Sequence, residues 1–108
     1  MTVSLIPTDQ KYQGDGRILK ADQFLARVRY DLDEEQERIS IEEAGTRAPL
    51  VQRGQKRLRG TIVVIEGDED LEKYSGGPII LHLADNRPVQ IVITSRTKRT
   101  PPTYKVRQ

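Results

Sequence analysis

The stretch that decides the fold is Ile79–Thr94, which reads IILHLADNRPVQIVIT. Apolar side chains recur at every second position on both sides of Asp85-Asn86-Arg87, a short polar segment whose asparagine tolerates left-handed backbone. Such alternation is typical of strands with one buried face. The stretch therefore predicts a hairpin with a three-residue loop, in which the facing pairs are Leu83 and Val89, Leu81 and Ile91, and Ile79 and Ile93.

The segments on either side of this hairpin also favour strands. Leu58–Ile65 is apolar on both faces near its end, which predicts a central or covered strand, with a bulge at Gly60. Between it and the hairpin, acidic residues at the start and a glycine at the end favour one short helix near 68–75, capped by Asp68. After the hairpin, Thr103–Arg107 predicts a last edge strand.

The first half of the chain predicts shorter strands separated by turns. Val3–Ile6 forms a strand that Pro7 ends, residues 13–16 form a turn, and residues 17–21 form the next strand. Residues 44–56 contain two glycines and a proline and are interpreted as a loop.

Residues 24–41 allow two interpretations. Period-two alternation favours a hairpin with its tip at 33–36, which places Tyr30 opposite Ile39. The alternative is a helix at 22–37, because apolar positions there also fit a repeat of 3.6 residues.

These segments together predict a single all-β, mainly antiparallel domain over residues 1–108. Its architecture is a small closed or partly open barrel or sandwich of six to eight short strands, with at most one short helix. The alternative is an α+β fold that contains the helix at 22–37.

The composition excludes several kinds of chemistry. The chain of 108 residues has no cysteine and one histidine, His82, so a disulfide framework, a thiolate nucleophile and a histidine–cysteine metal site are all ruled out. Nucleotide-binding and nucleophile-elbow motifs are missing as well. We therefore expect no enzyme, no cofactor and no metal.

No apolar run approaches ~20 residues and no signal peptide is visible, so we expect a cytoplasmic protein without a membrane partner.

Charge gives the one functional indication. Acids gather in 31–43 and 66–72, whereas cations gather in the Arg-rich loop 47–59 and the C-terminal segment 96–107. The leading hypothesis is a non-enzymatic module that binds another macromolecule, a protein or a second copy of itself. The alternative is sequence-independent nucleic-acid binding, although few aromatic residues are present to stack on bases. The candidate binding residues are Arg53, Lys56, Arg57, Arg59, Arg96, Lys98 and Arg99.

Overall fold

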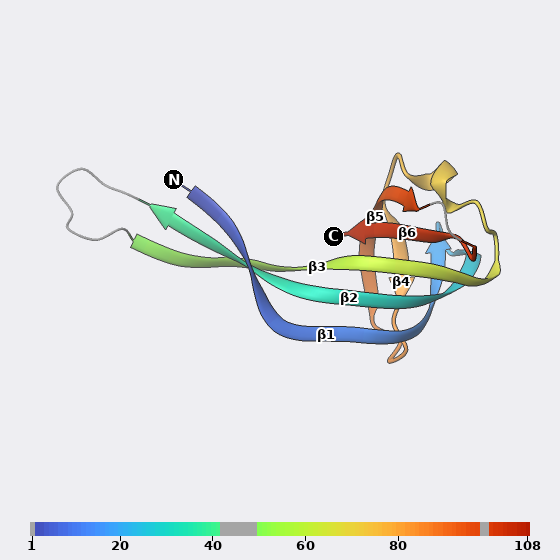
Figure 1. Ribbon diagram of the computed structural model, residues 1–108, viewed down its shortest axis with the longest axis horizontal. Helices are drawn as coiled ribbons and strands as arrows, with labels where there is room; N and C mark the ends of the chain where they lie inside the picture. Colours follow the sequence, from blue (N-terminus) through green and yellow to red (C-terminus); the bar gives the residue numbers. More distant parts are fainter. Residues whose placement is uncertain (1, 42–49, 98–99) are drawn as a thin grey trace.

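Six antiparallel strands close into one barrel in the order β1-β2-β3-β6-β5-β4 (Figure 1). A computed structural model describes residues 2–41, 50–97 and 100–108. A single turn of 3-10 helix, η1, lies between β3 and β4. The elements are β1 (Thr2–Lys20), β2 (Gln23–Ile41), β3 (Leu50–Gly67), η1 (Leu71–Tyr74), β4 (Ile79–His82), β5 (Pro88–Thr97) and β6 (Thr103–Arg107).

The first three strands are much longer than the barrel needs. β4 pairs with β1 only at Arg17–Leu19, and β6 pairs with β3 only at Arg59–Val63. The remainder of the three strands continues away from the barrel as a three-stranded ribbon (Figure 1). We call residues 2–11, 33–41 and 50–57 the arm. It makes the molecule elongated, with extents of 58 × 27 × 26 Å.

The hydrophobic core fills the barrel and is aliphatic apart from two tyrosines. Tyr104 is fully buried, and its hydroxyl accepts a hydrogen bond from the Leu71 backbone N–H at 3.0 Å and donates to the Glu69 carbonyl. These bonds hold η1 against the barrel. Interior side chains come from every strand: Ile18, Ala26, Val28, Tyr30, Leu32, Leu58, Ile62, Val64, Ile79, Leu81, Val89, Ile91, Ile93, Tyr104 and Val106.

Glycines in β1 and β3 make room for close packing. Gly16 lies so near the His82 carbonyl oxygen that a Cβ there would collide with it, and a Cβ at Gly14 would meet the Tyr30 ring. Gly60 lies similarly close to the Asp31 carbonyl oxygen. The predicted bulge at Gly60 is wrong, because the β2–β3 ladder keeps its register there. Glycines that resemble turn signals in the sequence are therefore sites of close strand approach.

The all-β class and the single short helical segment are confirmed, whereas the helix at 22–37 is wrong. The hairpin within 24–41 is also wrong, because these residues form one continuous strand, β2. β1 lies on one side of it and β3 on the other, so its backbone groups already have partners.

Three other boundaries differ from the prediction for the same reason. Pro7 and residues 13–16 lie within β1 and pair with β2, although the ladder is interrupted between Pro7 and Lys11. The chain turns at Ala21–Asp22 instead, where both residues have positive φ. Of the predicted loop 44–56, residues 50–56 are strand, and residues 44–49 lie outside the described part of the chain.

The C-terminal hairpin is confirmed, but its register is not. Ile79 faces Ile91 and Leu81 faces Val89, two positions away from the predicted pairs. The turn spans Leu83–Arg87, because the Leu83 N–H donates to the Arg87 carbonyl at 3.0 Å. Within it, Asn86 adopts a left-handed backbone conformation with φ 66°. The predicted cap at Asp68 is wrong as well: its Oδ1 accepts the Asp70 N–H, and η1 begins after Asp70 without a side-chain cap.

Candidate partner-binding surface

The arm exposes large apolar side chains that no other described part of the chain covers. Val3, Leu5 and Ile6 of β1 are 54%, 47% and 41% exposed, and Val51 of β3 is 45% exposed. These side chains lie on both faces of the ribbon, since Leu5 lines a groove on one face and Ile6 and Val51 line a groove on the other. The arm therefore carries the kind of surface that a binding partner covers.

Glutamates of β2 hold the three strands of the arm together. Glu37 pairs with Arg57 at 2.5 Å and Glu35 with Arg59 at 3.4 Å, both across the β2–β3 ladder. The side chains of these two glutamates are only 14% and 13% exposed. The Gln55 N–H donates to Glu37 Oε2 at 3.2 Å. These carboxylates therefore already have partners within the chain.

On the opposite face of the ribbon, the carboxylate of Glu34 also links neighbouring strands. It accepts hydrogen bonds from the hydroxyls of Thr8 and Tyr12, at 2.9 and 3.1 Å, and lies 3.9 Å from Lys56 Nζ. It thus connects β1 to β2 and β3 where the arm leaves the barrel.

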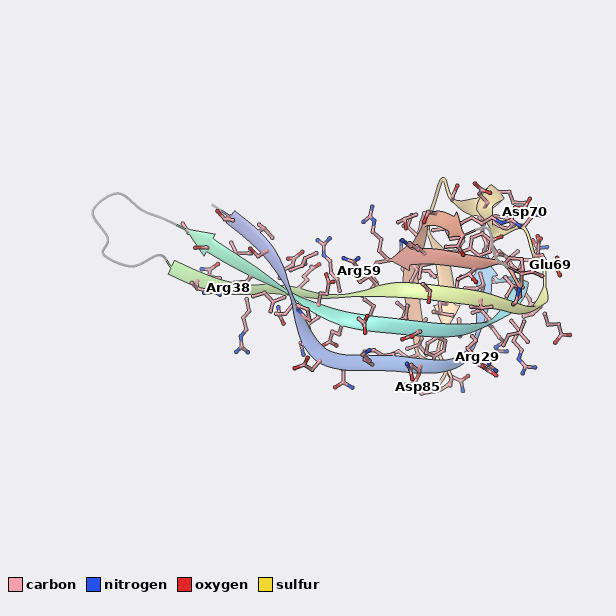
Figure 2. The ribbon with its side chains drawn as sticks, in the orientation of Figure 1. Arg29, Arg38, Arg59, Glu69, Asp70 and Asp85 are labelled. Carbon is pink, nitrogen blue, oxygen red and sulfur yellow. The ribbon has the colours of Figure 1, made fainter. Side chains whose placement is uncertain are left out.

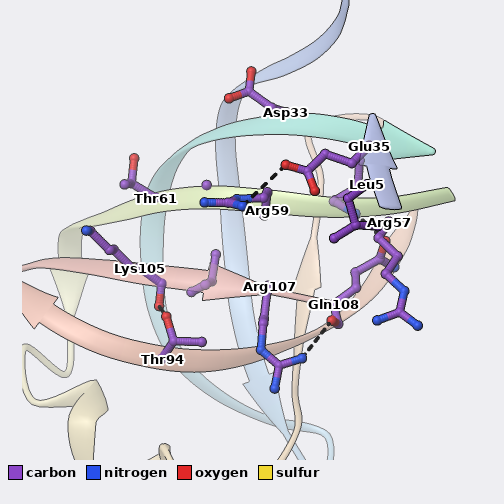
Figure 3. A pocket seen from close by; sticks show the side chains of 13 residues that line it. Leu5, Asp33, Glu35, Arg57, Arg59, Thr61, Thr94, Lys105, Arg107 and Gln108 are labelled. Carbon is purple, nitrogen blue, oxygen red and sulfur yellow. Dashed lines mark hydrogen bonds and ion pairs between the residues drawn. The ribbon is translucent and has the colours of Figure 1, made fainter. Parts of the chain in front are cut away.

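A groove of about 480 Å³ lies where the arm meets the barrel (Figure 3). Cations from two strands, β3 and β6, line it beside Leu5. Within the described residues, Lys105 and Arg107 have no carboxylate within 4 Å, whereas Arg59 has Glu35. The groove is lined by Leu5, Asp33, Glu35, Arg57, Leu58, Arg59, Gly60, Thr61, Thr94, Lys105, Val106, Arg107 and Gln108.

The predicted basic residues do not form one patch. Arg57 and Arg59 lie in this groove, where Arg59 is directly opposite Arg107 of β6. Arg53 and Lys56 line a separate groove on the other face of the arm.

The basic residues predicted near the C-terminus are even further apart. Arg96 lies opposite Tyr104, with its guanidinium carbon 6.0 Å from the ring centre. Lys98 and Arg99 lie outside the described residues. Among their described residues, the Arg-rich loop and the C-terminal segment thus bring basic side chains together around the Arg59–Arg107 pair.

Sequence reasoning missed the residues that most distinguish the arm. Arg38 belongs to the second groove together with Ile6, Val51 and Arg53, but the prediction placed it just after a hairpin tip. The alternation of 24–41, continued through its acidic middle, was the available signal for a single long strand.

The acidic segment 66–72 lies at the far end of the barrel from the tip of the arm (Figure 2, Glu69, Asp70 and Arg38). Lys73 Nζ lies 2.6 Å from Asp68 Oδ2, and this hydrogen bond lowers the pKa of Asp68 and raises the pKa of Lys73.

No protein-family model matches the chain, and neither a curated protein nor a solved structure matches it significantly. Among the residues that the structure describes, no helix has the length and apolar character needed to cross a bilayer.

Proposed function

We propose that the chain is a non-enzymatic protein-interaction module in which the barrel is the scaffold and the arm is the binding element. The observation that carries this proposal is the exposed apolar set Val3, Leu5, Ile6 and Val51 on a ribbon outside the core. A partner protein would bury these side chains and gain roughly 25 cal/mol for each Å² of apolar surface removed from water. The lack of cysteine fits a reducing compartment such as the cytoplasm.

A protein partner fits this surface better than a nucleic acid does. Nucleic-acid binding relies on cations free to contact phosphates, and on aromatic side chains where single strands are bound. Three of the four cations of 53–59 are paired with glutamates of β2. The exposed apolar residues of the arm, Val3, Leu5, Ile6 and Val51, are aliphatic and offer no aromatic ring to a base. Nucleic-acid binding therefore stays the second candidate function, and we expect it to be weak at physiological salt.

The test is affinity capture from an extract of the source cells with three immobilised proteins. These are the wild-type chain, the arm variant V3S/L5S/I6S, and the control variant F24S, which removes an exposed apolar side chain that lies outside the arm. Bound proteins are identified by mass spectrometry, and folding is verified from the unfolding transition of each variant.

We expect the same specific partner on the wild-type and F24S proteins and at least a tenfold loss on the arm variant, because that variant removes three of the apolar side chains that the partner would bury. Equal capture by all three proteins would show that the arm does not bind, and the proposal would be withdrawn. Capture of no specific partner by the wild-type chain would also count against it.

A further inference from the structure

The two free edges of the arm differ in how well they resist pairing with another strand. The β1 edge contains Pro7 and an interruption of the ladder between Pro7 and Lys11, where Asp9 has φ 64°. Proline, bulges and lysine all discourage strand addition. The β3 edge, Leu50–Arg57, has no proline and no residue with positive φ; it contains Lys56 and one register shift, where Gly54 and Gln55 lie opposite Glu37 alone. In the described part of the chain it pairs with β2 on one side and with no strand on the other.

The backbone at the start of this edge is already oriented to receive a strand. β6 runs along β3 as far as Arg107, and Gln108 exchanges backbone and side-chain hydrogen bonds with Leu58, both within 2.9 Å. Since strand backbone groups alternate in direction, the N–H and C=O of Lys56 point the same way as those of Leu58. A strand added beside Lys56 would therefore continue the line of β6, and it would cross the register shift of β3 at Gly54–Gln55 before it reached Arg53.

The charges beside this edge indicate what that strand contains. Arginine faces arginine at three places in the described ladders: Arg17 and Arg27, Arg59 and Arg107, and Arg38 and Arg53. Like charges directly opposite each other destabilise a sheet. In the first two pairs one arginine contacts a carboxylate of this chain, since Arg27 pairs with Asp15 and Arg59 with Glu35.

The Arg38–Arg53 pair differs from the other two. Neither guanidinium has a carboxylate within 4 Å among the described residues, and both side chains belong to exposed residues of the arm. Lys56 follows on the same face of β3. A strand with acidic side chains at alternate positions would place carboxylates beside Arg53 and Lys56 and relieve this repulsion.

We propose, on the basis of the binding function assigned to the arm, that the β3 edge takes up an extended acidic segment of a partner protein as an added strand. The same cations disfavour pairing between the β3 edges of two copies of this chain, because Arg53, Lys56 and Arg57 would then approach their own counterparts. Backbone hydrogen bonds supply affinity, and the Arg38–Arg53 pair supplies the selection for acid.

The test titrates three blocked octapeptides into the isotopically labelled full-length protein. The first alternates glutamate with valine, the second alternates lysine with valine, and the third repeats the first with every amide nitrogen methylated, which blocks the N–H donors of both edges. Affinity and amide exchange rates at Leu50–Arg57 are measured by NMR. The variant R38E/R53E is compared with R17E/K20E, which has the same change of net charge on the barrel part of β1.

We expect the glutamate peptide alone to bind and to slow amide exchange along Leu50–Arg57. R38E/R53E should weaken its binding at least tenfold and should bind the lysine peptide instead, which also shows that the variant is folded. R17E/K20E should change affinity by less than about threefold, because screening limits the effect of distant charges.

Three outcomes would each overturn the proposal. Amide exchange at Leu50–Arg57 could stay unchanged when the glutamate peptide is added, or the methylated peptide could bind as tightly as the unmethylated one. The third such outcome is that R17E/K20E loses as much affinity for the glutamate peptide as R38E/R53E does. If V3S/L5S/I6S loses its partner in the capture experiment while the glutamate peptide does not bind, strand addition fails and the function of the arm stands. If the peptide binds but that variant keeps its partner, the role of the apolar side chains fails instead.

Discussion

Within the single strand β2, Val28 lies in the barrel and Ile39 lies in the arm, and the two side chains have different surroundings. Val28 is fully buried among aliphatic residues of other strands, whereas Ile39 is half-buried on a ribbon with solvent beyond it. The barrel gains its stability from closure and a shared core. The arm depends on cross-strand pairs, each worth only roughly 0.2–1 kcal/mol. One long strand can therefore serve two purposes: one half of β2 stabilises the barrel, and the other half belongs to the arm that we propose binds a partner.

The same substitution in the two regions should give the largest contrast. Leu81 is fully buried in the barrel, so Leu81→Ala should lower the free energy of unfolding by about 2–5 kcal/mol. Leu5 is 47% exposed in the arm, so Leu5→Ala should lower it by less than about 0.5 kcal/mol. Urea unfolding of both variants measures the difference, and similar losses would mean that the arm belongs to the folding core.

Removal of a tyrosine hydroxyl should also lower the free energy of unfolding more in the barrel than in the arm, but by a smaller margin. Tyr104→Phe leaves the Leu71 N–H and the Glu69 carbonyl without their partner, a loss of about 1–3 kcal/mol. Tyr12→Phe removes a half-buried bond to Glu34 at 3.1 Å, a loss of less than about 1 kcal/mol. Thermal unfolding of the two variants checks the order, and a larger loss for Tyr12→Phe would contradict it.

The smallest effect is expected at the exposed Asp68–Lys73 pair. Because the pKa of Asp68 is lowered in the folded protein, its contribution is present above the pKa of an unfolded aspartate and is lost as pH falls through the folded value. The difference in Tm between the wild-type and D68N proteins should therefore be small at pH 7 and vanish in acid. A difference that grows as pH falls would have the wrong sign.

Local patterns predicted the strands of the barrel well because each buries one face. The alternation around Ile91 and the apolar run at Ile62 both lie in strands, and Tyr104 and Val106 share a buried face as predicted. The register of the C-terminal hairpin was beyond such patterns, since a shift of two residues keeps every side chain on its original face.

The arm could not be predicted because its strands are held by distant partners. Glu35 and Glu37 resemble a charged hairpin tip in the sequence, but they pair with Arg59 and Arg57, about twenty residues away. Gly14 resembles a turn, yet it lies in β1 beside the Tyr30 ring. The exposure of Leu5 and the Arg38–Arg53 pair became visible only once the three strands were placed side by side.

Amide hydrogen exchange of the free full-length protein at increasing urea tests the division between barrel and arm most directly. The amides of Ile91 and Ile93 in the barrel should exchange only through global unfolding, with a strong dependence on urea. Leu5 and Val51 of the arm should exchange through local opening, faster and with little dependence on urea. If the arm amides instead shared the free energy and urea dependence of the barrel, the arm would be part of the stable core, and its assignment as a separate binding element would be contradicted.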